Sequence, residues 1–149
     1  SFDPVTFETV NIARASNQGL ELMAAGPVGP GLLGLEATFQ NPRDESLDVA
    51  LKRRARESAA VNYRMPFDAW QLGAWLRYSG ARLDTDPATF SNATNPSRTT
   101  LALTAQRPLG KDWTLAFKLD NATGEDAPDI LGYTSAPRAL TVQLRGQWR

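Results

Sequence analysis

Seven stretches of the sequence alternate apolar with polar residues, and this period of two restricts the fold more than any other feature. Such alternation is typical of β-strands that have one apolar face and one polar face. The predicted strands span residues 7–24, 32–40, 56–64, 70–78, 99–106, 113–119 and 140–148. One short helix is expected over residues 47–54, in a connection between two strands. The chain is therefore predicted to be nearly all-β.

The connections between the predicted strands alternate between short and long. The short ones are rich in Pro and Gly, as hairpin turns are. They span residues 26–31, 65–69 and 107–112, and the long polar ones span residues 41–55, 83–98 and 121–139. An antiparallel meander places all the short turns at one end, as in outer-membrane barrels with short periplasmic turns and long external loops. The sequence therefore predicts a transmembrane antiparallel β-barrel in the bacterial outer membrane.

Aromatic residues near the strand ends support this interpretation. Tyr63, Trp70, Trp113 and Trp148 fall at the short-turn end of their strands, and Tyr78 falls at the other end. Each is in phase with the apolar residues of its strand, as expected for residues of a girdle at the membrane interface. We therefore predict these five side chains as membrane-interface residues.

The alternation alone leaves open which face is inside. In a soluble β-sandwich or a lipocalin-like barrel, the apolar faces would form an ordinary core and the charged faces would point outward. Trp75 lies in phase with the polar residues, so either it fills the lumen of a barrel or the phase of its strand is wrong.

Seven antiparallel strands cannot close into an antiparallel barrel, because the first and the last run in the same direction. An open sheet in lipid would leave unpaired backbone groups along both edges, at a cost of several kcal/mol per group. A turn at residues 16–19 would split the long first strand and give eight strands in a self-contained barrel. Otherwise the chain is one part of a larger barrel.

The composition excludes several classes of function. The chain has no Cys and no His, which removes disulfides, thiol nucleophiles, His-based triads and the usual zinc sites. Sixteen basic and sixteen acidic residues cancel, so no nucleic acid is expected as a partner. No apolar run approaches the about 20 residues of a membrane-spanning helix. We therefore expect neither an enzyme nor a helical membrane protein.

Three segments resemble the TonB-dependent outer-membrane receptors. They are Asn11-Ile12-Ala13-Arg14-Ala15-Ser16-Asn17-Gln18-Gly19-Leu20-Glu21-Leu22, the basic Leu51-Lys52-Arg53-Arg54-Ala55-Arg56, and Gly132-Tyr133-Thr134-Ser135-Ala136-Pro137-Arg138 before the last strand. The third is similar to the carboxy-terminal signature of cobalamin receptors. Two features depart from that pattern: residues 121–127 lack an apolar pair and a Tyr, and Arg149 follows the terminal aromatic Trp148.

The resemblance implies that residues 1–149 are the carboxy-terminal segment of a barrel of about 22 strands, without its plug domain and earlier strands. It favours one continuous first strand, and so seven strands over eight. The implied function is uptake of a scarce nutrient, cobalamin or a related corrinoid, energised through TonB. The implied partners are the remaining barrel and plug, TonB through the plug, outer-membrane lipid and lipopolysaccharide. The alternatives are a siderophore receptor and a self-contained eight-stranded barrel with a structural or adhesion role.

Candidate ligand contacts lie in the long connections, where function concentrates. They are the aromatics Phe90 and Tyr133, the polar Asn92, Asn95 and Thr134, and the basic Arg53 and Arg54. The two arginines are suited to an anionic ligand or to lipopolysaccharide phosphates, and alternatively face the lumen.

No cofactor is expected. Two carboxylate clusters, Asp84 with Asp86 and Glu125 with Asp126 and Asp129, leave calcium in the external loops as an alternative.

Overall fold

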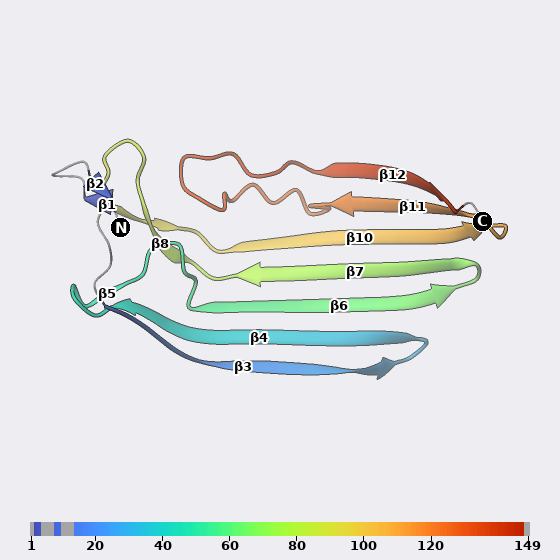
Figure 1. The fold of residues 1–149 in the computed structure, drawn as a ribbon, viewed down its shortest axis with the longest axis horizontal. Coiled ribbons are helices and arrows are strands. Elements are labelled where there is room, and N and C mark those ends of the chain that lie inside the picture. The colour runs from blue at the N-terminus through green and yellow to red at the C-terminus, as the bar shows by residue number, and fades with distance from the viewer. Residues whose placement is uncertain (1, 4–7, 10–13, 148–149) are drawn as a thin grey trace.

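The computed structural model describes residues 2–3, 8–9 and 14–147. Its main body is a single antiparallel sheet whose seven long strands follow one another as a meander (Figure 1). These strands are β3 (Ala15–Val28), β4 (Gly31–Asp44), β6 (Glu57–Phe67), β7 (Trp70–Ser79), β10 (Arg98–Leu109), β11 (Trp113–Asp120) and β12 (Ala139–Gly146). The predicted all-β fold is confirmed.

Five short strands complete the described part of the chain. β5 (Val49–Ala50) pairs with the end of β4, β8 (Arg82–Thr85) pairs with β9 (Asn92–Asn95), and β1 (Phe2–Asp3) pairs with β2 (Glu8–Thr9). No helix occurs in the described residues, so none is long and apolar enough to cross a membrane.

The helix predicted over residues 47–54 is therefore wrong. The Asp44 carboxylate accepts the backbone N–H groups of Ser46 and Leu47 in a turn, and the Leu51 N–H then donates to the Pro42 carbonyl. Side chains such as Asp offer the backbone this alternative to helical hydrogen bonds. The segment folds back on β4 as the short strand β5 instead.

The short and long connections lie at opposite ends of the sheet. The short turns that join β3 to β4, β6 to β7 and β10 to β11 lie at one end in Figure 1, and the long connections lie at the other. Gly29, Asp68 and Gly110 in these turns have positive φ, as tight hairpins require. The predicted sorting of connections is confirmed.

The first long strand decides the strand count. β3 runs without a break from Ala15 to Val28 and pairs with β4 through Ser16 and Gly19. A turn at residues 16–19 is therefore absent, and the eight-strand alternative is wrong. The strand starts at Ala15 rather than at residue 7, since Glu8 and Thr9 belong to β2, and residues 10–13 lie outside the described part.

The strand registers align the apolar residues on one face of the sheet. Residues directly opposite each other share a face. One row of partners across five strands is Ala24, Leu35, Val61, Leu76 and Leu101, and the next row, on the other face, is Met23, Glu36, Ala60, Arg77 and Thr100. The predicted phases therefore hold across the sheet, which has an apolar face and a polar face.

Nothing in the described residues covers the apolar face. No hydrophobic side chain is buried there, and large ones such as Leu22 and Val142 are at least half exposed. A soluble β-sandwich or lipocalin-like barrel would bury this face as its core, so that alternative is wrong. An apolar face of this extent marks a surface that contacts a membrane or a partner.

Four of the five predicted girdle residues, those within the described part of the chain, lie on the apolar face. Trp70 and Trp113 begin β7 and β11 at the short-turn end, and the Tyr63 hydroxyl donates to the Val28 carbonyl at 2.8 Å. Tyr78 lies near the long connections and donates to the Glu57 carboxylate at 3.0 Å. Trp148 lies outside the described residues. A role at the membrane interface stays a prediction for all five.

Trp75 lies on the polar face, because its partners are Asn62 on β6 and Ala102 on β10. Its side chain lines a cavity of about 370 Å³ together with Arg64 and Gln71. The phase of its strand is therefore correct, which agrees with a Trp that fills part of a lumen.

Candidate functional site

The three long connections meet at one group of residues above the sheet. The first connection joins β4 to β6, the second joins β7 to β10, and the third joins β11 to β12. We call Arg53, Arg82, Asp84, Asn95 and Leu131 the loop cluster. Arg53 comes from the first connection, Leu131 from the third, and the other three from the β8–β9 hairpin of the second. Segments far apart in the sequence are thus fixed to one another.

Asp84 is the centre of the loop cluster and is fully buried. Its carboxylate accepts the Arg53 guanidinium Nε–H at 2.9 Å, the Leu131 backbone N–H at 2.9 Å and its neighbour Thr85's N–H at 2.8 Å. Burial raises the pKa of this carboxyl, but the N–H groups of Leu131 and Thr85 and the Arg53 guanidinium outweigh it and lower the pKa to about 2. Asp84 is therefore ionised at physiological pH and holds all three connections.

Arg82 and Asn95 attach the third connection to the hairpin. The Arg82 Nη2 group donates to the carbonyls of Pro128 at 3.1 Å and Asp129 at 2.8 Å. The Asn95 amide donates to the same Asp129 carbonyl at 3.3 Å. Backbone carbonyls that turn inward in this way need such donors, because a buried unpaired carbonyl is costly. The third connection is therefore ordered although it has no regular secondary structure.

Asn121 and Glu125 order the base of the third connection. The Asn121 amide donates to the Glu125 carbonyl at 2.8 Å and to the Ala136 carbonyl at 3.0 Å, and so joins the two ends of the segment. The Glu125 carboxylate accepts the N–H groups of Ala127 and Thr99, and these two hydrogen bonds lower its pKa. Asn121 adopts a positive φ, which Asn tolerates better than most residues.

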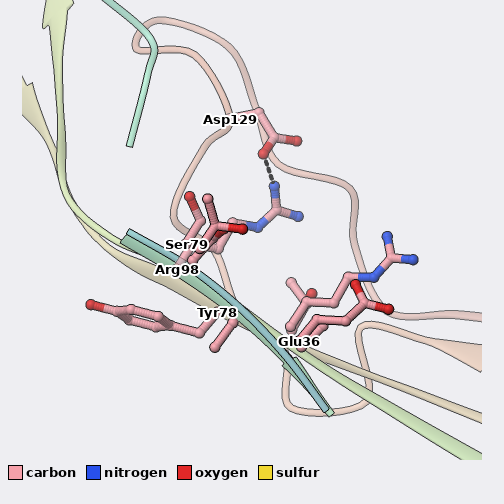
Figure 2. Close-up of a pocket in the computed structure, with 11 residues that line it drawn as sticks. Glu36, Tyr78, Ser79, Arg98 and Asp129 are labelled. Carbon is pink, nitrogen blue, oxygen red and sulfur yellow. Dashed lines mark ion pairs between the residues drawn. The ribbon is translucent and has the colours of Figure 1, made fainter. Parts of the chain in front are cut away.

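A cavity of about 440 Å³ lies between the third connection and the polar face of the sheet. Figure 2 shows Asp129 on the connection in an ion pair with Arg98, and Glu36 lies on the same side of the strands. Arg77 lines the cavity as well. Tyr78 points away on the opposite side of the sheet (Figure 2). The arrangement is a charged, open cavity beneath a loop that the Arg98–Asp129 ion pair and the hydrogen bond from Thr99 to Glu125 fasten to β10.

The predicted ligand contacts divide into two groups. Phe90, Asn92, Tyr133 and Thr134 are exposed, with 46% of Phe90 and 72% of Tyr133 accessible. Phe90 occupies the tip of the β8–β9 hairpin with a positive φ. Asn95 is fully buried in the loop cluster, so its side chain has no surface for a ligand in this arrangement.

The two candidate arginines have different surroundings. The Arg53 guanidinium is half exposed but is paired with Asp84 at 2.9 Å, and its backbone N–H donates to the Leu83 carbonyl. Arg54 is exposed. Arg53 therefore connects two loops, whereas Arg54 remains available to an anionic group.

Four of the five carboxylates of the calcium hypothesis already have partners, and Asp129 is the one paired with Arg98. Asp84 and Glu125 accept the hydrogen bonds described above, and Asp86 accepts the N–H groups of Ala88 and Thr89. In the described part of the chain, no group of three or more Asp or Glu side chains is placed to hold a metal ion. Calcium in the external loops stays a prediction that only binding measurements test.

The sequence does not reveal Arg82, Arg98 or the pairing role of Asp129. Arg82 begins β8 and Arg98 begins β10. Their partners lie in the third connection, 46 or 47 residues away from Arg82. The only local signal for Arg98 is the alternation in β10, which places Arg98 opposite Ser79 on the polar face, where the cavity lies.

A model of the TonB dependent receptor-like β-barrel family matches residues 1–122. The chain belongs to this family. TonB-dependent receptors are transport receptors in the bacterial outer membrane, which confirms the predicted localisation and the family resemblance. The apolar face of the sheet is accordingly the face toward lipid, and the polar face is the face toward the lumen.

Solved structures with the same fold include the pyoverdine receptor FpvA of Pseudomonas aeruginosa. FpvA bound to a heterologous ferric pyoverdine matches with a TM-score of 0.76 and 15% identity, over 89% of this chain and 19% of that chain. FpvA bound to pyoverdine matches with a TM-score of 0.74 and 13% identity, over 90% of this chain and 22% of that chain. The complex of FpvAI with pyocin S2 matches with a TM-score of 0.73 and 15% identity, over 89% and 20%.

The chain thus spans about a fifth of the length of these solved receptors. At this identity the likeness shows the barrel fold alone. No curated protein sequence matches the chain.

Proposed function

We propose that this chain is the carboxy-terminal part of the barrel of a receptor that imports a scarce nutrient through the outer membrane. In this proposal the missing strands and a plug complete the barrel, and TonB supplies energy through the plug. The observation that carries the proposal is the joining of three external connections by the loop cluster above a charged cavity. A rigid group of loops over a lumen is suited to hold a ligand before it enters.

Cobalamin is the first candidate ligand, because the segment Gly132 to Arg138 is similar to the signature of cobalamin receptors. A ferric siderophore is the second, because two of the solved structures with this fold hold a ferric pyoverdine. Both are large metal complexes, and exposed aromatics such as Phe90 and Tyr133 suit contact with either.

Growth of a strain that lacks the complete receptor separates the two ligands. We expect plasmid-borne receptor to restore growth on limiting cobalamin, or on a ferric siderophore as the iron source, and inactivation of TonB to abolish that growth. If growth is restored on the siderophore and not on cobalamin, the ligand is a siderophore. No restoration on either nutrient would contradict the proposed function.

A single side chain tests the position of the ligand. Tyr133→Ala removes an exposed aromatic, and we expect about a tenfold loss of affinity in the purified complete receptor. The matched control is Leu47→Ala, which removes an equally exposed apolar side chain from the first connection. Equal affinity of both variants and the wild type would remove Tyr133 from the site.

A further inference from the structure

The lipid-facing side of the sheet contains a groove of about 410 Å³ across β6, β7, β10, β11 and the start of β12. Ala74 and Ala105 form its floor, and Tyr63, Leu72, Phe117 and Leu119 stand beside them. The strand registers explain the shape: Ala74 is the partner of Tyr63, and Ala105 is the partner of both Leu72 and Phe117. Small residues opposite large ones leave a depression where a thin apolar chain fits.

Arg107 lies beside this groove on the same face. It is two residues from Ala105 along β10, so about 7 Å further toward the short turn, and its partner is the apolar Leu115. The guanidinium carbon lies 5.9 Å from the centroid of the Trp70 ring. Within the described residues, no carboxylate lies within ion-pair distance of Arg107.

Arg107 is the charged residue of the apolar face that lies near the short turns. The other charged strand residues described on the apolar face, Arg43 and Glu57, lie near the long connections, and each has a partner. A cation at the middle of the bilayer costs several kcal/mol, whereas one at the level of the interface can reach water, a headgroup or a counter-ion. Arg107 therefore lacks a counter-ion from this part of the protein, and an anion from the membrane can supply it.

We propose that one phospholipid of the periplasmic leaflet binds at this position. Its phosphate pairs with the Arg107 guanidinium beside the Trp70 ring, and one acyl chain lies over Ala105 and Ala74. The orientation of the site fits a lipid of the periplasmic leaflet. The short turns of such barrels are periplasmic, so the headgroup would lie at Arg107, and the groove extends from there toward the middle of the sheet, where the acyl chain would lie. Trp at the level of the headgroups is expected there as well.

The observations favour a phospholipid over other occupants. Lipopolysaccharide is in the external leaflet, where its phosphates would lie near the long connections rather than beside Arg107. A second protein would have to cover the apolar face, and the site offers one cation and an open apolar groove instead. The acyl chain contributes close packing against the groove walls, and the guanidinium contributes selectivity for a phosphate.

Native mass spectrometry of the complete receptor in detergent tests whether the charge of Arg107 contributes to lipid binding. The protein is titrated with palmitoyl-oleoyl phosphatidylglycerol, and the half-saturation of the first bound lipid is measured. We expect Arg107→Gln to raise this value about fivefold, because one basic residue at a membrane surface contributes about a factor of that size. Arg107→Lys retains most of the binding. Arg145→Gln is the matched control, because Arg145 lies on the polar face of β12.

A second variant tests the groove. Ala105→Phe fills the floor and should lower the fraction of receptor with one bound lipid, whereas Leu144→Phe adds a ring to the same face outside the groove. Heat-modifiable migration confirms that each barrel is folded, and if Ala105→Phe fails to fold, the Arg107 variants decide. Wild-type binding by Arg107→Gln, binding of lipopolysaccharide in place of phospholipid, or a receptor dimer that covers the groove would overturn the proposal.

This inference depends on the outer-membrane location of the barrel and not on the imported nutrient. If the receptor binds lipid but imports neither nutrient, the lipid site stands and the proposed function fails. If the receptor imports a nutrient but its lipid binding does not depend on Arg107, the lipid site fails and the proposed function stands.

Discussion

Asp84 is a buried charge whose partners come from two other connections, so its substitution tests how the loops are held. Asp84→Asn keeps the shape but replaces a carboxylate oxygen by an NH₂ group, which faces the donors of Arg53 or Leu131. We expect a loss of about 1–3 kcal/mol of local stability. Hydrogen exchange of the complete receptor should show faster exchange of the Leu131 amide, with the barrel strands unchanged.

Asp86→Asn is the matched control for this substitution. Asp86 accepts hydrogen bonds from Ala88 and Thr89 inside the hairpin tip, and an Asn side-chain oxygen retains them. Its pKa is lowered by those N–H groups, yet it contacts no other connection through them. Equal protection of Leu131 in the wild type and in both variants would contradict the role of Asp84.

Acid provides a second test of the same residue. The pKa of Asp84 is about 2 in the folded protein, below the value of about 3.9 in an unfolded chain. The ionised carboxylate therefore stabilises the loop cluster fully above about pH 4, and this contribution disappears as the pH falls toward 2. The difference in Leu131 protection between wild type and Asp84→Asn should be constant near neutral pH and should vanish toward pH 2. A difference unaffected by acid would contradict the low pKa.

The strands were predictable because their pattern is local. For the two strands Trp70–Ser79 and Trp113–Asp120, the alternation predicts both ends within one residue of the observed ends. The connections were not predictable because their contacts are distant in sequence: Asp84 is 31 residues from Arg53 and 47 residues from Leu131. Asn95 shows the consequence, since its loop position indicated a ligand contact and its environment is the interior of the cluster.

Gly19 shows how strand pairing restricts the sequence of β3. A Cβ at this position would overlap the Phe39 carbonyl oxygen and contact Gln40, whereas a Cβ at Gly26 on the same strand would meet nothing within 4 Å. We expect Gly19→Val to destabilise the complete barrel by about 1–3 kcal/mol, with Gly26→Val close to wild type. Urea unfolding followed by heat-modifiable migration measures the difference. Equal midpoints for the two variants would contradict this close approach.

The whole sheet is open, with β3 and β12 as its two edges. Both edge strands run in the same direction, because an even number of antiparallel steps separates them (Figure 1). Pairing them directly would require a parallel contact in an otherwise antiparallel sheet. The apolar face and the two edges together therefore require further antiparallel strands before the sheet can lie in lipid with its backbone satisfied.

This requirement predicts the behaviour of the 149-residue chain expressed alone. Refolded into phosphatidylcholine vesicles, it should aggregate or remain accessible to protease, and it should lack a compact heat-modifiable form, because each edge leaves a row of backbone groups unpaired in hydrocarbon. The complete receptor, refolded in the same vesicles, is the control and should be protected. Intact-mass measurement identifies the protected species. A protected monomer of 16.3 kDa would show that the seven strands close by themselves, and the larger barrel proposed for this chain would then be wrong.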